Sequence, residues 1–355
     1  MQGKKGLLAA LVVVVVLLGV GSYFGLVYYS SHSLKAKVDS FIDQMKDDAD
    51  VSYKGLTTRP FAGALDISEM TITPKDKSGT VKVKEVTLYG KAGVGLKAEP
   101  KGVLLKNIEF TSADKEKGSP VVIKEVEVSD MVMSGDICVK STSNIRGITI
   151  DSKNLKEKDR EEFKQLFNSD KLLIDGVLNH DYAAEKKELQ ERILINTKGL
   201  GELTLNLRLG NLDYAKFAAK DWKKNKDPLQ MLSVAAEWSI INLELAYKNI
   251  ALVENILKFA AQKKGQDTKE LVQATLQQLE ETKQLTKMLG DLPPQVENSL
   301  HAGVDALKKF IQQPKSLKLT IAPAKPVVIG SIMGAANNPG KFLQELNLSL
   351  TADGS

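Results

Sequence analysis

The residues that could carry out chemistry in this chain are few and widely spaced. Its three histidines, His32, His180 and His301, are isolated, and the H-E-x-x-H spacing that would build a zinc site does not occur. Cys138 is the single cysteine, so neither an intramolecular disulfide nor a multi-cysteine metal site can form. No G-x-S-x-G nucleophile elbow is present, and GKAGVG at 90–95 lacks the G-K-[ST] ending of a phosphate-binding P-loop. We therefore expect no enzyme, no catalytic residues, no metal and no cofactor.

Composition and charge are those of an ordinary folded chain. Hydrophobic residues make up 43% and charged residues 26% of the 355 positions, which is long enough for one large domain or two smaller ones. The formal charge of +5 arises from 49 basic and 44 acidic residues, and no basic run of five or six occurs. Because nucleic-acid binding needs a concentrated basic patch, we expect no nucleic-acid partner.

The N-terminus predicts a membrane anchor. Lys4 and Lys5 precede an uncharged, strongly apolar stretch at 6–29, and the next charged residue is Lys35. About 20 apolar residues span a bilayer as a helix, and aromatic residues cluster at the far end, where interfacial rings are favoured. A cleaved signal peptide is the alternative, but its apolar core is usually shorter and ends at a small-x-small site. We expect an uncleaved anchor.

The same segment predicts location and one contact between copies. A short basic N-terminus before a long apolar run indicates that the N-terminus is cytoplasmic, so the rest of the chain lies outside the cytoplasm. We expect a single-pass protein of the bacterial inner membrane with a periplasmic C-terminal domain. Gly21 and Gly25 form a GxxxG pair that could let two such helices dimerise, although glycine is common in spanning helices anyway.

Five segments share one unusual strand pattern, apolar-x-apolar-x-x-apolar-x-apolar, and they lie at 65–72, 81–88, 103–110, 121–128 and 144–150. Side chains alternate between the two faces of a strand, so the extra residue would send the second apolar pair to the wrong face. A β-bulge or a sharp bend at the central polar pair would keep all the apolar side chains on one side. The repetition predicts an antiparallel sheet with one apolar face.

The candidate binding residues are the apolar pairs that flank each central polar pair. Two interpretations stay open for this face: it is covered as an ordinary core, or it lines a groove that accepts acyl chains. The polar pairs include Lys84, Lys106, Lys124 and Arg146, which could face anionic headgroups, but neighbouring glutamates favour a solvated outer face. The candidate lipid-facing or core residues are Ile67, Met70, Val83, Val86, Leu105, Ile108, Ile123, Val126, Ile145 and Ile148.

Further along the chain, hydrophobic spacing predicts more strands and then a helical segment. A helix is expected at 156–167, and three antiparallel helices joined by short loops are expected between about 251 and 313. A small helical insert is expected near 328–336. The expected strands lie at 171–182, 191–199, 202–213, 240–247, 316–321 and 346–352.

The anchor, the repeated strands and the segment GELTLNLRLGNLD at 201–213 resemble the YdgA-like envelope proteins of bacteria, whose function is unknown. They are more loosely similar to AsmA-like inner-membrane proteins. The AsmA-like resemblance implies a role in outer-membrane biogenesis or phospholipid traffic, with a lipid or an envelope protein as partner. A structural scaffold that binds only other envelope proteins is the alternative.

The expected fold class is α+β: a single transmembrane helix, then a repeat-like antiparallel β-rich domain with a three-helix segment near the C-terminus. The expected parts are a cytoplasmic N-terminus (1–5), the anchor (6–29), a juxtamembrane helix or linker (30–50), the β-repeat region (51–250), the three-helix segment (251–313) and closing strands (314–355).

Overall fold

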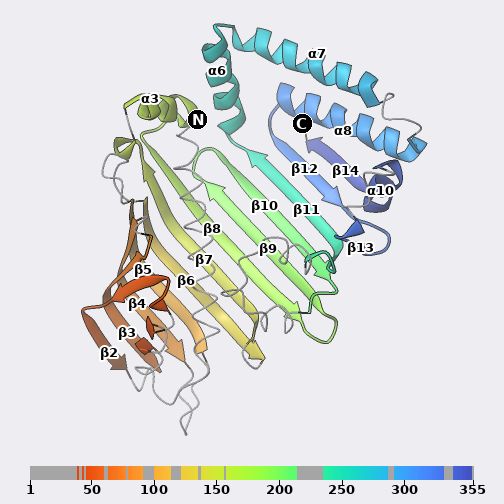
Figure 1. The fold of residues 1–355 in the computed structure, drawn as a ribbon. Coiled ribbons are helices and arrows are strands. Elements are labelled where there is room, and N and C mark those ends of the chain that lie inside the picture. The colour runs from red at the N-terminus through yellow and green to blue at the C-terminus, as the bar shows by residue number, and fades with distance from the viewer. Residues whose placement is uncertain are drawn as a thin grey trace. The chain divides into compact units, whose positions relative to one another are not determined.

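The computed structural model divides the chain into two compact units, which we call the N-terminal unit (Met1–Asn179) and the C-terminal unit (His180–Ser355). Strand β8 (Lys171–Ala183) runs across this boundary. Figure 1 shows strands running through both units and the longest helices in the C-terminal unit. The structure describes residues 38–39, 42–43, 45–59, 63–76, 79–90, 100–112, 121–134, 137–155, 157–213, 235–286, 292–331 and 339–353.

The expected α+β class is wrong, because strands dominate the fold. Strand accounts for 52% of the described residues, in 14 mostly antiparallel strands, against five α-helices. The physical reason lies in strand length: the repeated pattern predicts segments of about eight residues, yet strands β3 to β7 continue for 11 to 15 residues. Strand ends such as Ser129–Ser134 remain in the sheet although they lack the apolar alternation that reveals a strand.

The expected transmembrane helix finds no support in the structure. Among the residues that the structure describes, no helix is long and apolar enough to cross a membrane. The predicted anchor at 6–29, and Gly21 and Gly25 within it, lie outside the described residues.

The N-terminal unit is built on antiparallel strands that pair in chain order. Its edge is shared by two short strands, β1 and β2, which both pair with β3. From β3 onward each strand pairs with the next as far as β7, so the five repeated segments lie side by side. The elements are β1 (Ala49–Ser52), β2 (Gly55–Arg59), β3 (Ala64–Pro74), β4 (Gly79–Gly90), β5 (Pro100–Ser112), β6 (Val121–Ser134), β7 (Ile137–Asp151) and helix α3 (Glu157–Phe167).

The change of face within each repeated strand occurs without a shift in register. Ser68 pairs with Glu85 and Met70 with Val83, so Glu69 and the residue opposite it, Lys84, are skipped together. One residue of each strand is skipped in the same way between β4 and β5, between β5 and β6, and between β6 and β7. The register is the same on both sides of these skipped residues. A β-bulge would leave two residues of one strand opposite one residue of its partner. Of the two devices expected, the bulge is therefore wrong at these positions, because all five strands change face together.

In every second strand, the skipped residue has a left-handed backbone. The φ angles are 50° at Glu69 in β3, 51° at Asn107 in β5 and 68° at Gly147 in β7. A left-handed backbone costs most residues about 1–2 kcal/mol, glycine much less, and asparagine enters this region more readily than most. In β7 the backbone N–H of Gly147 also donates to the Asp175 carboxylate of β8 at 2.7 Å. A side chain of β8 thus accepts a hydrogen bond from the left-handed residue of β7.

The C-terminal unit holds the later antiparallel strands of the sheet and most of the described helical residues. Strands β9, β10, β11, β12 and β14 lie in that order, and the short strand β13 pairs with the start of β11. Helix α8 packs on β12 and β14, while α7 packs on α8 and α6 on α7 (Figure 1). The elements are β9 (Glu188–Thr197), β10 (Gly201–Gly210), β11 (Ser239–Asn249), α6 (Leu252–Lys264), α7 (Thr268–Thr286), α8 (Pro294–Gln312), β12 (Ser316–Ile321), β13 (Val327–Val328), α10 (Pro339–Leu346) and β14 (Leu348–Asp353).

Several predicted elements of this unit are confirmed. The strand at 240–247 is β11, three helices follow it, and the strand at 316–321 is β12. The helical insert expected near 328–336 lies mostly outside the described residues: Val328 belongs to β13, Ser331 is helical, and the next described element is the short helix α10, which begins at Pro339. Pro339 suits the first turn of a helix because its missing N–H would have no helical partner there.

The three helices leave the sheet and return to it at one point. Strands β11 and β12 pair as a hairpin whose ends, Lys248 and Ser316, lie opposite each other, and α6–α8 form the connection. The buried side chain of Asn249 joins the two ends of this connection, and we call this point the Asn249 neck. Its Nδ2 donates to Glu254 Oε2 and to Pro314 O, both at 2.7 Å. Its Oδ1 accepts from the backbone N–H of Val253 at 3.0 Å, which satisfies a free donor at the start of α6. The neck fixes where α8 can lie on the sheet.

Candidate functional site

The ten candidate residues of the repeated strands come together in the N-terminal unit. All of them are between 1% and 6% exposed and belong to one hydrophobic cluster, which we call the N-terminal core. Leu65, Leu88 and Val103 extend this cluster along the same strands. The two apolar pairs of each strand thus lie on one face, as the repeated pattern predicts.

The N-terminal core is covered by the chain that precedes it. Val38 is 3% exposed and belongs to the cluster, and Ile42 and Met45 of the same helical segment pack against it. Val51 of β1, Tyr53 between β1 and β2, Leu56 of β2 and Ile174 of β8 also pack against this cluster. These contacts are those of a closed core, with protein side chains where a groove would hold a ligand.

The opposite face of these strands carries charges of alternating sign. Antiparallel pairing places the polar residues in the order Ser68, Glu85, Lys106, Glu125 and Arg146 across the sheet. Arg146 Nη1 donates to Glu125 Oε1 at 2.6 Å, and Lys106 Nζ lies 3.8 Å from Glu85 Oε2. The four basic residues considered from the sequence therefore do not form one ladder: Lys106 and Arg146 alternate with glutamates in one row, and Lys84 and Lys124 lie in the next row with Asn107 between them.

The cysteine and the histidines, which could carry out chemistry, lie apart from one another. Cys138 is 7% exposed beside Val128 and Met131, and burial raises the pKa of its thiol. His180 Nδ1 lies 3.1 Å from Glu191 Oε1, and His301 Nε2 lies 3.9 Å from Glu297 Oε1. No group of three or more histidine, cysteine or acidic residues that could hold a metal occurs within the described ranges. His32 and the residues 91–95 lie outside those ranges.

A second apolar face lies on the sheet of the C-terminal unit. Pairing places Leu205 between Ile193 of β9 and Leu245 of β11, and the row continues through Leu319 of β12 to Leu350 of β14. Parallel rows run on either side of it. We call the following twelve residues the C-terminal apolar face: Ile193, Ile195, Leu203, Leu205, Leu207, Leu243, Leu245, Leu317, Leu319, Ile321, Leu348 and Leu350.

This face differs from the N-terminal core in exposure. Every one of its twelve side chains is partly exposed, and none reaches the burial of a core residue. The opposite face of the same strands carries polar residues such as Asn206, Glu244 and Lys318. One side of the sheet is thus aliphatic and incompletely covered, and the other is polar.

Helix α8 covers one end of the C-terminal apolar face. A Cβ at Gly303 would lie 3.7 Å from Leu350 Cβ, so the helix backbone runs close over β14. The ring of Phe310 meets that of Tyr247 edge to face, with centroids 6.3 Å apart, and this contact closes the face beside β11. No described helix makes an extensive contact with β9 or β10. The aliphatic side chains of the face on those two strands are partly exposed, as are those on β11, β12 and β14, whereas the paired Leu189 and Leu209 at one end of β9 and β10 are buried.

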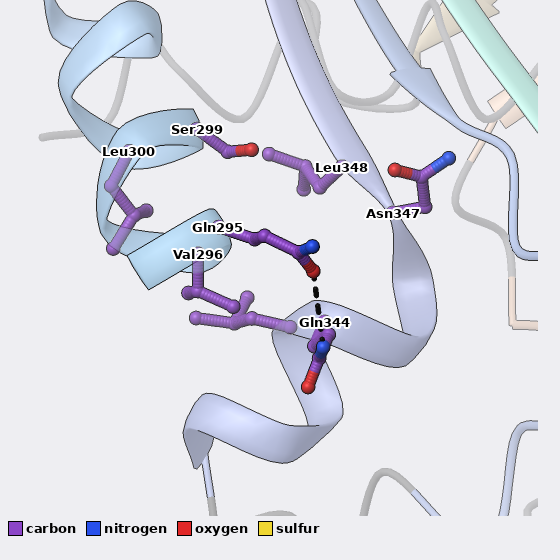
Figure 2. A pocket seen from close by; sticks show the side chains of 8 residues that line it. Gln295, Val296, Ser299, Leu300, Gln344, Asn347 and Leu348 are labelled. Atoms are coloured by element: carbon purple, nitrogen blue, oxygen red, sulfur yellow. Dashed lines mark hydrogen bonds between the residues drawn. The ribbon is translucent and has the colours of Figure 1, made fainter. Parts of the chain in front are cut away.

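A small pocket lies where α8, α10 and the start of β14 meet. Figure 2 shows Gln295 of α8 and Gln344 of α10 pointing toward each other, and Gln344 Nε2 donates to Gln295 Oε1 at 3.2 Å. The pocket has a volume of about 50 Å³, which is room for one or two water molecules at about 30 Å³ each. Small-molecule sites usually need about 300–1,000 Å³, so this pocket is too small for an acyl chain.

The C-terminal apolar face was not predicted as a candidate site, although the alternation that produces it is visible in the sequence. The alternation of Leu203, Leu205 and Leu207 predicts one apolar face for β10, and Leu243 with Leu245 predicts the same for β11. What alternation cannot show is whether a helix covers that face. The five repeated strands drew attention because their pattern was unusual, whereas the regular strands carry the more exposed face.

Comparison with known proteins bears on the C-terminal unit. A protein-family model described as "Uncharacterized protein" matches residues 194–353. The match begins within β9 and ends with β14, so it covers the sheet that carries the C-terminal apolar face. A search of curated proteins gives no match. The matching description names no activity and no ligand.

Proposed function

We propose that the protein is a non-enzymatic lipid-binding protein of the bacterial envelope, and that the C-terminal apolar face holds the acyl chains. The observation that carries this proposal is the incomplete cover of twelve aliphatic side chains aligned in rows across five strands. Apolar surface left in contact with water is costly at about 25 cal/mol per Å², so an apolar ligand would be stabilised there.

The residue types on this face favour an acyl chain over a protein partner. Protein interfaces concentrate their binding energy in tryptophan, tyrosine and arginine anchors. The twelve residues that define the face are leucine or isoleucine; their rows also contain Glu191, opposite Leu207, and Tyr247, opposite Leu203, whose ring is already packed against Phe310. Aliphatic side chains offer dispersion and burial without directional contacts, and acyl chains can use little else.

The resemblance to YdgA-like proteins, and the looser one to AsmA-like proteins, supplies the setting of the proposal. It suggests a protein at the bacterial inner membrane with its C-terminal domain in the periplasm, supporting outer-membrane biogenesis. Fusing alkaline phosphatase after Asp353 tests this location, because the reporter is active only outside the cytoplasm. An inactive, stably expressed fusion would overturn the periplasmic placement and leave the binding proposal untouched.

A matched pair of variants tests the binding proposal. Leu205→Asp places a carboxylate on the C-terminal apolar face, and Thr204→Asp places the same charge on the opposite face of the same strand. We expect the fluorescent fatty acid cis-parinaric acid to bind the wild type and Thr204→Asp alike. Binding to Leu205→Asp should be at least about tenfold weaker, because an unpaired charge against an acyl chain costs a few kcal/mol.

The controls separate loss of binding from loss of folding. Circular dichroism should show the same strand content in both variants. Equal binding by all three proteins, or a wild type that binds no fatty acid, would contradict the proposal. A protein that binds no fatty acid but retains an envelope protein on purification would favour the scaffold.

A further inference from the structure

A second hollow lies on the polar face of the N-terminal unit, away from the C-terminal apolar face in the chain. It has a volume of about 760 Å³ and spans the strands β4, β5, β6 and β7. This volume falls within the range of about 300–1,000 Å³ that is typical of small-molecule sites. We propose that this hollow binds an acidic sugar, with Tyr89 against the ring and Lys101 and Lys140 against the acidic groups.

The hollow arises from small residues beside a large one. Tyr89 pairs with Gly102, and Ser129 pairs with Thr142, so glycine, serine and threonine follow the tyrosine across the sheet. A Cβ at Gly102 would lie 2.4 Å from the carbonyl oxygen of Val128, so no other residue fits there without movement. Because Gly102 has no side chain, the surface is hollowed there, beside the aromatic ring of Tyr89.

The backbone of β6 departs from regular pairing at the same place. The register between β6 and β7 shifts between Ser129 and Val132, and Asp130 has a left-handed backbone with φ 54°. Residues held in such strained conformations cluster at functional sites, because surrounding structure must enforce them. The shift turns Met131 into the protein, where it is 2% exposed, and leaves Ser129 and Asp130 at the hollow.

The acidic and the basic side chains around the hollow differ in whether they already have partners. Glu127 Oε2 lies 3.7 Å from Arg146 Nη2, and Asp130 Oδ2 accepts a hydrogen bond from Ser129 Oγ at 3.2 Å. Within the part of the chain that the structure describes, neither Lys101 nor Lys140 forms an ion pair or a side-chain hydrogen bond. The lining therefore offers two ammonium groups and hydroxyl groups to a ligand, while its two acidic groups already have partners.

These features match an acidic sugar better than a simple anion or a neutral sugar. An aromatic ring gives the C–H face of a sugar ring a flat apolar contact, and hydroxyls and ammonium groups bind its oxygens. Burial raises the pKa of Tyr89, so its phenol stays protonated at neutral pH and can donate a hydrogen bond. A carboxylate or phosphate on the sugar would take charge-assisted hydrogen bonds from the lysines.

The test uses the full-length protein and trigalacturonic acid as the probe, with maltotriose and inorganic phosphate as comparison ligands. Isothermal titration should show binding of the acidic trisaccharide and at least about tenfold weaker binding of the other two, since each lacks one half of the recognition. Tyr89→Ala and the double variant Lys101→Glu/Lys140→Glu should each weaken trigalacturonic acid at least about tenfold. Lys84→Glu, a charge reversal on the same polar face but outside the hollow, should bind like the wild type.

Three results would overturn the proposal. They are a folded wild type that binds no trigalacturonic acid, equal binding of maltotriose or phosphate, and variants of the hollow that bind as well as Lys84→Glu. A spectrum and melting curve for each variant guard against misfolding. None of these results bears on fatty-acid binding, which depends on a different unit of the chain.

Discussion

Two apolar sheet faces in this protein have the same kind of residues and different surroundings. The N-terminal core aligns apolar side chains across five strands and seals them at 1–6% exposure. The C-terminal apolar face also aligns aliphatic side chains across five strands, yet all twelve stay partly exposed. The difference teaches that strand pattern decides which face is apolar, while the cover laid over it decides whether the face can bind.

The cover differs in kind between the two faces. Residues 38–56 and β8 place side chains directly against the N-terminal core, as Val38, Met45 and Leu56 show. Among the described helices of the C-terminal unit, α8 is the one that packs extensively on the sheet, on β12 and β14. One helix is about 10 Å wide, the width of roughly two strands, so it cannot cover five strands.

The largest expected effect comes from charging the N-terminal core. Val126 is 1% exposed, so Val126→Asp would bury a carboxylate with no partner. We expect a loss of several kcal/mol, a large share of the roughly 5–15 kcal/mol that stabilises a typical domain. Urea unfolding followed by circular dichroism should show the N-terminal unit unfolded or nearly so.

Val126→Ala serves as the control for lost packing without added charge. It should cost a few kcal/mol at most and leave the protein folded. A Val126→Asp protein that melts within a few degrees of the wild type would mean that the face is hydrated. That result would restore the lipid-facing interpretation of the repeated strands.

A smaller effect is expected at the level where the repeated strands change face. Gly147 has φ 68°, and a Cβ there would lie 2.9 Å from Lys124 Cβ. Gly147→Ala should therefore cost about 2 kcal/mol, from left-handed strain and from crowding together. Gly199, in the turn before β10, has φ 76° with no atom within 4 Å of such a Cβ, so Gly199→Ala should cost only the strain, about 1 kcal/mol.

Chemical denaturation of the two alanine variants checks this difference. Equal losses would show that Lys124 moves aside freely and that the left-handed angle alone matters. No loss in Gly147→Ala would mean that β7 can change face without a left-handed residue, as β4 and β6 do at Lys84 and Lys124.

The charge at Leu205 should cost less stability than the charge at Val126. Leu205 is partly exposed, so water can still reach the carboxylate of Leu205→Asp. We expect a loss of about 1 kcal/mol, close to that of substitutions outside a packed core. A loss as large as that of Val126→Asp would show that the C-terminal apolar face is a core after all, and the proposed lipid site would then fail.

The smallest effect is a pH dependence on the outer face of the N-terminal unit. Arg59 donates two hydrogen bonds to Asp66, at 2.5 and 2.8 Å, and with Thr87 it lowers the pKa of that carboxyl below its ordinary 3.8. The stabilisation is therefore present above about pH 4 and is lost as the pH falls through the lowered folded pKa. Because the pair is about one-third to one-half exposed, its contribution should be under about 1 kcal/mol.

Asp66→Asn isolates this contribution. The wild type should exceed the variant in unfolding free energy at pH 7, and the gap should narrow as the pH falls below about 4 and through the lowered pKa of Asp66. A gap that does not change with pH would mean that Asp66 acts through hydrogen bonding or packing and not through its charge. Binding of fatty acid to the C-terminal unit should not change between wild type and variant.

The sequence allowed the strands and their apolar sides to be predicted, because period-two alternation depends on local geometry alone. The repeated pairs such as Ile67 with Met70 correctly indicated one shared face. The concerted change of face could not be predicted, since it appears only when Glu69, Lys84 and Asn107 are aligned by pairing. The strand end Ser129–Ser134 was missed because its register shifts, and its three apolar residues follow one another without alternation.

The candidate site was harder to predict than the fold. The sequence showed equally apolar faces in both halves, and only the position of α8 and of residues 38–56 distinguishes a covered face from an open one. Those positions follow from long-range contacts such as the Asn249 neck, which joins residues 65 positions apart in the chain. The hollow beside Tyr89 likewise depends on which residues pair across strands, not on any local motif.

The most direct test of the central claim is to map where an acyl chain touches the protein. Full-length protein would be irradiated with a fatty acid that carries a diazirine on its chain, digested, and analysed by mass spectrometry. We predict cross-links in β9, β10 and β11, near Ile193, Leu205 and Leu245, and their loss when excess unlabelled fatty acid competes. Cross-links concentrated at 121–128 in the N-terminal core, or none that a competitor removes, would contradict the account.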